Sequence, residues 1–251
     1  MNKIYALALG LVTVSSSVYA EESKNVPDPV NVANVRTALT FGINDDGSGK
    51  ASADISGNYN PTFSYMLKAE GEWNEDQKYS GARFQYYNLA NTNFKYIPKT
   101  ALSYDYFRLE EDNDSLNVDM HAIGSISTIP LGKNSKVTLS PQIAYLQSTF
   151  DFKGGAERKP DGIMSVVYLS KGIGKKGSYV MVYPEYYKLK GDGIDYEQKN
   201  INFTFGSTLT QDKKWWYIVE FFHKENETSV DGFKVKSNDN VVNFKIRRFF
   251  F

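Results

Sequence analysis

The sequence predicts an all-β protein: a single transmembrane antiparallel β-barrel of about twelve strands, with short turns at one rim and longer loops at the other. Three observations support this prediction. Apolar and polar residues alternate along most of the chain, the alternating segments are long enough to cross a membrane as tilted strands, and the chain ends in Phe249, Phe250 and Phe251. Exposed aromatic residues on a free chain end favour aggregation in water. The terminal phenylalanines therefore indicate either a buried end or surroundings other than water.

The first twenty residues predict a secretory signal peptide. Lys3 precedes a short apolar run at 4–14, and a small-residue cleavage site ends at Ala20. The run is shorter than the roughly 20 residues of a membrane-spanning helix. We therefore expect cleavage near Ala20, an extended lead-in over 21–34 and a barrel over 35–251.

The composition fits a membrane barrel and limits the partners. The 251 residues include 18 Tyr, 16 Phe and no Cys, so disulfides do not stabilise the fold. The mean hydropathy of −0.45 is that of a water-soluble chain, but a membrane barrel shares it because its lumen and loops are polar. Without the signal peptide, 28 basic and 29 acidic residues remain. A charge so close to zero argues against a nucleic-acid partner.

A period of two identifies the strands, because successive side chains of a strand point to opposite faces. In the first strand Leu39 and Phe41 fall on one face, and Arg36 and Thr40 fall on the other. The same rule places strands at 35–43, 50–59, 63–73, 79–90, 99–110, 115–129, 136–150, 162–173, 178–190, 200–211, 215–225 and 240–251.

The connections alternate between short, mostly basic turns and longer, more acidic loops. The short turns are at 60–62, 92–98, 130–135, 172–178 and 210–214, and the other set is at 45–49, 74–78, 110–115, 152–162, 190–199 and 225–239. Outer-membrane barrels have short periplasmic turns and longer extracellular loops. An even number of strands then returns the C-terminus to the periplasmic side.

The two faces of the strands differ as lipid outside and water inside require. The outward set is Leu39, Phe41, Tyr65, Leu67, Phe84, Tyr86, Val137, Leu139, Ile143, Phe203, Phe205, Val219, Phe221, Phe244 and Ile246. Aromatic residues near strand ends suit interfacial girdles: Trp73, Tyr79, Tyr96, Tyr179, Trp215, Trp216 and Tyr217. A secreted β-sandwich would also alternate, but its strands are typically shorter and its apolar face must fill a core.

The inward faces carry charges of both signs. The basic candidates are Arg36, Lys50, Lys68, Arg83, Lys245 and Arg247, and the acidic ones are Asp54, Glu70, Glu72, Asp119, Glu185 and Glu220. A basic ring would attract carboxylate solutes. A mixed lumen would instead form ion pairs and a transverse field, or the charges would only hydrate and hold the barrel, and the sequence leaves these alternatives open.

The last strand contains a conflict of phase. Counting back by twos from Phe251 gives Phe249, Arg247 and Lys245, whereas the apolar residues of this strand, such as Phe244, fall in the other phase. This predicts a bulge or frayed end near Arg247 and Arg248, with Lys245 and Arg247 facing the lumen.

Several segments resemble the oligogalacturonate-specific porin family, which includes sialic-acid-type channels. They are VTLSPQIAYLQ (137–147), SYVMVYPEYYKLKGDG (178–193), WWYIVEFFHKE (215–225) and NFKIRRFFF (243–251). The family shows a central Pro followed by aromatic residues, and a tryptophan-containing penultimate strand. Pro141, Pro184 and the Trp216-Tyr217-x-x-Glu220 stretch match these features.

The resemblance implies a monomeric channel in the outer membrane of a Gram-negative bacterium. It would contact outer-membrane lipid and pass small hydrophilic solutes, acidic oligosaccharides among them, by diffusion. Lys68, Arg83, Lys245 and Arg247 would attract the solute, and Glu70, Glu72 and Glu220 would shape the constriction. A terminal Phe is typical of the signal that barrel-assembly machinery reads, which assigns that role to Phe249, Phe250 and Phe251.

Other chemistry has little support in the sequence. Asp119 and His121 alternate onto one face with Ser125 and Ser127, but the stretch does not match the outer-membrane phospholipase. With two His and no Cys, no metal-ligand cluster exists. We expect no catalytic site, no metal and no cofactor. A structural or adhesive barrel with a plugged lumen, and a barrel lipid hydrolase, remain as alternatives.

Overall fold

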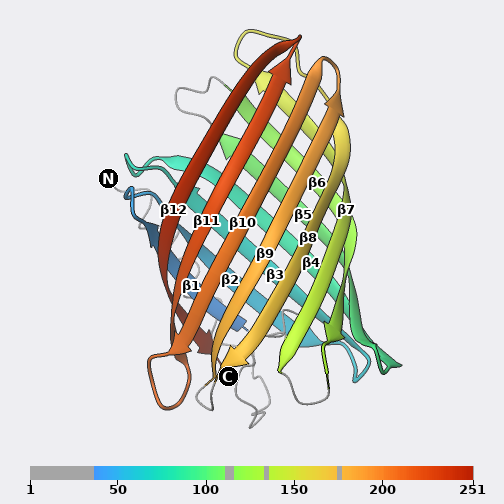
Figure 1. Cartoon of the computed structure of the whole chain (residues 1–251), viewed down its shortest axis with the longest axis vertical. Coiled ribbons are helices and arrows are strands. Elements are labelled where there is room, and N and C mark those ends of the chain that lie inside the picture. Colours follow the sequence, from blue (N-terminus) through green and yellow to red (C-terminus); the bar gives the residue numbers. More distant parts are fainter. Residues whose placement is uncertain (1–36, 111–115, 133–135, 174–176, 251) are drawn as a thin grey trace.

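The alternating segments form a closed antiparallel barrel of twelve β-strands (Figure 1). The computed structural model describes residues 37–110, 116–132, 136–173 and 177–250. Consecutive strands are hydrogen-bonded neighbours, and β1 closes the barrel against β12. No helix in this described part of the chain is long and apolar enough to cross a membrane. The strands are β1 (Thr37–Asn44), β2 (Gly49–Asn58), β3 (Phe63–Trp73), β4 (Tyr79–Phe94), β5 (Ile97–Glu110), β6 (Leu116–Pro130), β7 (Val137–Phe152), β8 (Asp161–Ile173), β9 (Ser178–Gly191), β10 (Ile194–Thr208), β11 (Trp215–Val230) and β12 (Phe233–Phe250).

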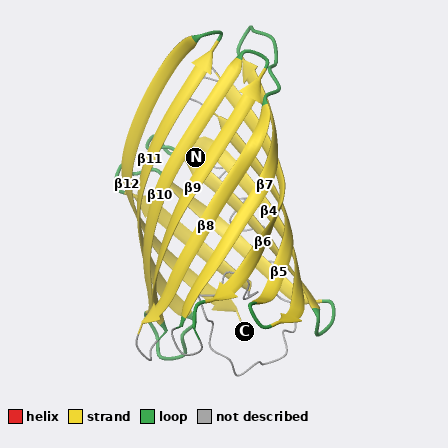
Figure 2. Cartoon of the chain, turned by 45° about the vertical axis from the view of Figure 1, so that its right-hand side comes forward, coloured by secondary structure: helices red, strands yellow, loops and turns green. Residues whose placement is uncertain are grey.

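The strands differ in length around the barrel, so its wall is not equally high on all sides. We call the end at which β12 finishes the lower end, and the opposite one the upper end, as drawn in Figure 1. β1 and β2 have 8 and 10 residues, whereas β11 and β12 have 16 and 18. The wall from β7 to β12 therefore rises above β1 and β2 at the upper end (Figure 2). The predicted fold and strand number are confirmed. The predicted signal peptide, the lead-in at 21–34, Arg36 and Phe251 lie outside the described residues.

Two of the predicted loops, 190–199 and 225–239, are mostly strand. Each contains a two-residue Asp-Gly turn, with positive φ at Asp192 (48°) and Gly193 (76°), and at Asp231 (50°) and Gly232 (88°). Positive φ at both central residues defines the type I′ turn, whose twist matches that of a hairpin, and Asp-Gly is a preferred sequence for it. The loop prediction at these positions is wrong, and the Asp-Gly pairs were the signal that identifies the hairpins.

The last strand has no bulge. β1 and β12 pair without interruption from Thr37↔Phe250 to Asn44↔Asn243, so the predicted irregularity near Arg247 and Arg248 is wrong. The inward phase simply continues to Phe249, which is buried inside the barrel rather than turned towards lipid.

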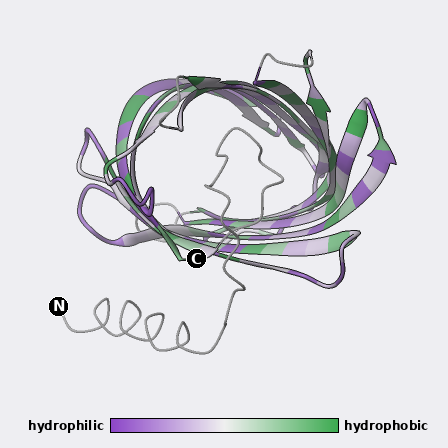
Figure 3. Cartoon of the chain, turned by 90° about the horizontal axis from the view of Figure 1, so that it is seen from below, coloured by the Kyte–Doolittle hydropathy of each residue, from purple (hydrophilic) through white to green (hydrophobic). Residues whose placement is uncertain are grey.

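The outer surface of the barrel is apolar, as predicted. Phe41 and Ile143 point away from the lumen and remain 55% and 61% exposed in the isolated chain. Figure 3 shows the oval outline of the barrel from below, with strands that alternate between hydrophobic and hydrophilic residues. An apolar outer face on a closed sheet is what a membrane-spanning barrel requires, because closure pairs the backbone groups of every strand.

An aromatic cluster lies inside the lumen at the lower end. Trp216 and Phe249 meet edge to face with ring centroids 6.1 Å apart, and Tyr179 packs against the other side of Trp216 at 6.1 Å. Tyr179 and Trp216 were predicted to lie in the interfacial girdle, and this prediction is wrong. Neighbouring residues on a strand face opposite sides, so Trp216 must point inward if Trp215 and Tyr217 point outward.

An arginine ties three connections together at the upper end. The Arg158 guanidinium, from the segment between β7 and β8, donates to both carboxylate oxygens of Asp231 at 2.7 and 2.5 Å and to the Asp192 carbonyl at 3.0 Å. The amide of Asp231 also donates to the Gly193 carbonyl at 2.9 Å. We call Arg158, Asp192 and Asp231 the upper-end latch.

The latch predicts an acid-sensitive upper end. The hydrogen bond from Arg158 lowers the pKa of the Asp231 carboxyl below its ordinary value, which is about 4. A group with a depressed folded pKa stabilises the fold above its ordinary pKa, and this contribution is lost as the pH falls through the lower value. We expect the hydrogen-exchange protection factor of the Asp231 amide to fall between pH 6 and pH 3. In Asp231→Asn it should be low at both pH values.

The matched control for this experiment is Asp212→Asn in the turn at the lower end, where the carboxylate accepts from Thr210. This change should leave protection of the Asp231 amide unaltered. Equal protection in the wild-type protein and Asp231→Asn at pH 6 would show that the latch does not order the upper end.

Candidate solute pathway

The predicted charged residues are gathered inside the barrel. Lys50, Lys68, Arg83, Lys245 and Arg247 all face the lumen in the register of the strands, as do Glu70, Glu72 and Glu220. Arg36 is not among the described residues. This arrangement agrees with the predicted inward positions of these residues.

Asp119 is the exception, and its predicted inward position is wrong. It lies on the outer face of β6, where it accepts from the Tyr106 hydroxyl at 2.5 Å and from Arg108 at 3.5 Å. The inward face of this part of β6 is apolar, with Val118 and Met120 buried. The sequence rule that places polar residues inward therefore assigns the wrong face to this strand.

Three lysines of the lumen form ion pairs rather than a free basic ring. Lys68 lies 3.0 Å from Glu70, and Lys50 lies 3.6 Å from Glu70 and 3.7 Å from Glu72. Lys245 forms an ion pair with Glu220 of the neighbouring β11. Each of these ammonium groups is compensated by a carboxylate, so their attraction for an acidic solute is reduced.

The two arginines are compensated as well. Arg83 donates to both oxygens of Asp105 at 3.0 and 2.5 Å, and its guanidinium lies 4.3 Å from the ring centroid of Phe107. Arg247 lies 3.9 Å from Asp54. Asp105 was missed by the sequence reasoning, although the alternation of 99–110 places it on the same face as Phe107. We call this side of the lumen the charged arc: Lys50, Lys68, Glu70, Arg83, Asp105, Glu220 and Lys245.

The facing side of the lumen carries tyrosines. Tyr168 of β8 and Tyr183 of β9 lie with ring centroids 5.2 Å apart and ring planes inclined by 32°. Tyr187 follows Tyr183 on the inward face of β9. We call Tyr168, Tyr183 and Tyr187 the tyrosine arc. Alternation along 178–190 is the signal that could have identified its β9 members.

The two arcs meet across the lumen. The rings of Phe107 on β5 and Tyr187 on β9 contact edge to face at 6.5 Å, although four strand positions separate β5 from β9. The contact between Phe107 and Tyr187 therefore bridges the lumen and marks a constriction.

Above the tyrosine arc, the walls of β6–β10 are apolar. Leu146, Met164 and Leu189 are almost fully buried and belong to a continuous cluster with Phe150 and Ile194. The lumen thus has two chemically different sides, one charged and ion-paired and the other mainly aromatic and apolar. Glu185, predicted to face inward, lies between Tyr183 and Tyr187 on this second side and accepts from Asn200 at 2.8 Å.

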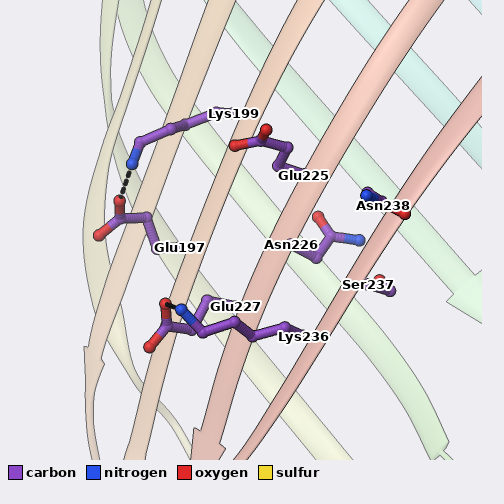
Figure 4. Close-up of a pocket in the computed structure, with 8 residues that line it drawn as sticks. All are labelled: Glu197, Lys199, Glu225, Asn226, Glu227, Lys236, Ser237 and Asn238. Carbon is purple, nitrogen blue, oxygen red and sulfur yellow. Dashed lines mark ion pairs between the residues drawn. The ribbon is translucent and has the colours of Figure 1, made fainter.

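A cavity of about 460 Å³ lies at the upper part of β10–β12 (Figure 4). Lys199 is paired with Glu197 at 2.6 Å, and Lys236 with Glu227 at 2.8 Å. Because both of its lysines are paired, the cavity presents no basic group free for an acidic ligand, and we assign it no role in transport.

The two histidines do not form a hydrolytic site in the described residues. His121 points outward, and its Nδ1 lies 2.8 Å from the Tyr104 hydroxyl. Ser127, on the same strand face, lies 3.1 Å from the Thr100 hydroxyl instead. The Nδ1 atom of His223 forms a hydrogen bond with the Asn240 side-chain oxygen at 2.8 Å. In the described residues no group of three or more His, Asp or Glu side chains could hold a metal ion.

Two solved structures to which this chain is similar are porins. The NanC porin superposes with a TM-score of 0.57 at 8% sequence identity, covering 86% of this chain and 100% of that porin. The fold is that of a porin. The KdgM porin in complex with disordered oligogalacturonate gives a TM-score of 0.50 at 12% identity, with the same coverage of both chains. No protein-family model and no curated protein sequence matches the chain. At these identities the likeness concerns the porin fold, which confirms the expected architecture.

Proposed function

We propose that this protein is a monomeric outer-membrane channel through which small hydrophilic solutes diffuse passively. The observation that carries the proposal is the closed barrel with an apolar outer face around a polar, charged lumen. The porin fold and the predicted signal peptide support it, and together they favour the outer membrane of a Gram-negative bacterium. The terminal phenylalanines, of which Phe249 and Phe250 are described, would serve as the signal for barrel-assembly machinery.

The charges of the lumen favour weak ion selectivity. Lys68, Arg83, Lys245 and Arg247 remain the candidates for attracting a solute, and Glu70, Glu72 and Glu220 for shaping the constriction. Each of these four basic groups is within 3.9 Å of a carboxylate. A fixed pair of opposite charges presents a dipole rather than a net charge, so neither anions nor cations are strongly favoured. The oligogalacturonate complex of the KdgM porin suggests acidic oligosaccharides as solutes. With weak ion selectivity, the channel would pass them but would not prefer them to neutral solutes.

Single-channel conductance tests the proposal most directly. The refolded protein is inserted into a planar bilayer under a salt gradient, and steady current with a small reversal potential is the expected result. A folded, heat-modifiable barrel that carries no current would contradict the proposal. That result would favour the structural or adhesive barrel with a plugged lumen, for which the contact between Phe107 and Tyr187 provides the closure.

Removal of the two lumenal arginines should change the selectivity of the channel. In Arg83→Ala/Arg247→Ala the carboxylates of Asp105 and Asp54 lose their partners, and the lumen becomes net negative relative to the wild-type protein. We expect the reversal potential to shift towards that of the cation. Arg248→Ala is the matched control, because Arg248 points outward beside Trp215. An unchanged reversal potential in the double variant would remove these arginines from the pathway.

A further inference from the structure

We propose that the constriction favours uncharged, ring-shaped solutes with hydroxyl groups, and that neutral saccharides bind there more tightly than acidic ones. This inference deepens the proposed function and rests on it. It assigns the selection of the solute to the tyrosine arc rather than to the basic residues of the charged arc.

The ionised side chains of the charged arc are already paired with one another. Asp105 is 2% exposed and accepts from Arg83 twice and from Gln85 at 2.8 Å. An acidic solute that binds Arg83 bidentately must displace this buried carboxylate and leave it unpaired. Leaving a buried charge without its partner is costly. The geometry therefore disfavours the exchange that an acid-selective site needs.

By contrast, two hydroxyls of the tyrosine arc are not satisfied. The hydroxyls of Tyr168 and Tyr187 have no hydrogen-bond partner among the described residues, whereas the hydroxyl of Tyr87 accepts from Gln85 at 2.8 Å. The rings of Tyr168 and Tyr183 lie side by side at 5.2 Å and form an aromatic surface with polar edges. Such a surface binds a molecule that has an apolar face and hydrogen-bonding groups at its rim.

Aromatic rings also line the constriction that a solute passes. The contact between Phe107 and Tyr187 bridges the lumen, so a molecule that passes this level must displace the two rings or slide along them. The carbon–hydrogen face of a sugar ring matches an aromatic face, and its hydroxyls match the free phenols. A charged carboxylate would lose water there, and the cation at this level, Arg83 beside Phe107, is already paired with Asp105.

Block of the ionic current measures this preference. Cellobiose, digalacturonate and the open-chain polyol sorbitol are added in turn to channels in a planar bilayer, and the half-blocking concentration is determined for each. We expect cellobiose to block at a concentration about fivefold lower than digalacturonate, a ratio that corresponds to roughly 1 kcal/mol. Sorbitol, which has hydroxyls but no ring, should block less than cellobiose.

Matched variants separate the two sides of the lumen. Tyr168→Leu/Tyr183→Leu keeps apolar bulk but removes the aromatic faces, and should abolish the advantage of cellobiose. Tyr186→Leu is the control, because Tyr186 lies on the outward face of the same strand. Heat-modifiable mobility on gels confirms that each variant is folded.

The outcomes distinguish this inference from the proposed function. A steady current with equal block by both sugars, or with tighter block by digalacturonate, overturns the inference and leaves the channel in place. A preference for cellobiose that survives in Tyr168→Leu/Tyr183→Leu moves the selection away from the tyrosine arc and also overturns it. A folded barrel without current overturns both.

Discussion

Replacing Trp216 with alanine is expected to lower the free energy of unfolding of the barrel by about 3–5 kcal/mol, the usual cost of truncating a fully buried aromatic side chain. Trp216 is 1% exposed, and it packs against Phe249 and Tyr179 at the point where the last strand ends. Its indole nitrogen also donates to the carbonyl of Lys213 at 2.8 Å. The truncated residue would leave a cavity and an unpaired carbonyl in the lower end.

The neighbouring tryptophan provides the control. Trp215 points outward and is 38% exposed, so Trp215→Ala should cost clearly less than Trp216→Ala. Urea unfolding in detergent micelles, followed by tyrosine and tryptophan fluorescence, measures both variants. A cost for Trp215→Ala that equals or exceeds that of Trp216→Ala would show that the outward residue, and not the lumenal cluster, stabilises this end.

The central parts of the strands could be predicted from the sequence because lipid and water impose different chemistry on the two faces. Phe203 and Phe205 of β10 and Phe244 and Ile246 of β12 alternate with polar residues for this reason. Alternation of apolar and polar residues arises where a strand has lipid on one face and a polar lumen on the other. In such segments the predicted strand and its outward face agree with the structure.

The upper ends of the strands could not be predicted in the same way. Between Glu225 and Asn240 the hairpin of β11 and β12 has charged or polar residues on both faces, such as Glu227 and Lys236 outward and Asn226 and Ser237 inward. Both faces of this hairpin contact water, so its residues are polar on both faces and do not alternate in hydrophobicity. Such a sequence pattern is the same as that of a loop. Turn chemistry, rather than hydrophobic periodicity, identifies such extensions.

The candidate site could be predicted as a set of residues but not as a set of pairs. Alternation placed Lys245 and Glu220 in the lumen, and their pairing follows from the register of β11 against β12, which the sequence leaves undetermined. The contact between Phe107 and Tyr187 depends on how the barrel is flattened, and no local pattern encodes it. The sequence therefore indicated a charged lumen, and the structure shows that the charges of the charged arc are paired with one another.

Removing the arginine of the constriction is the second change with a large expected effect. Arg83→Met should lower the free energy of unfolding by roughly 3–5 kcal/mol, because it leaves a buried carboxylate without its cation. The side chain of Asp105 is 3% exposed, so water cannot replace the guanidinium. The stacking of Arg83 on Phe107 would be lost as well, which loosens the ring that meets Tyr187 across the lumen.

A second variant separates the unpaired charge from the lost packing. Asp105→Asn removes the negative charge at nearly constant volume, so Arg83→Met/Asp105→Asn should recover most of the stability lost in Arg83→Met. Urea unfolding of the four proteins gives the coupling energy directly. If the double variant is no more stable than Arg83→Met, the cost arises from the lost contact with Phe107, and the constriction is maintained by that stacking rather than by the ion pair.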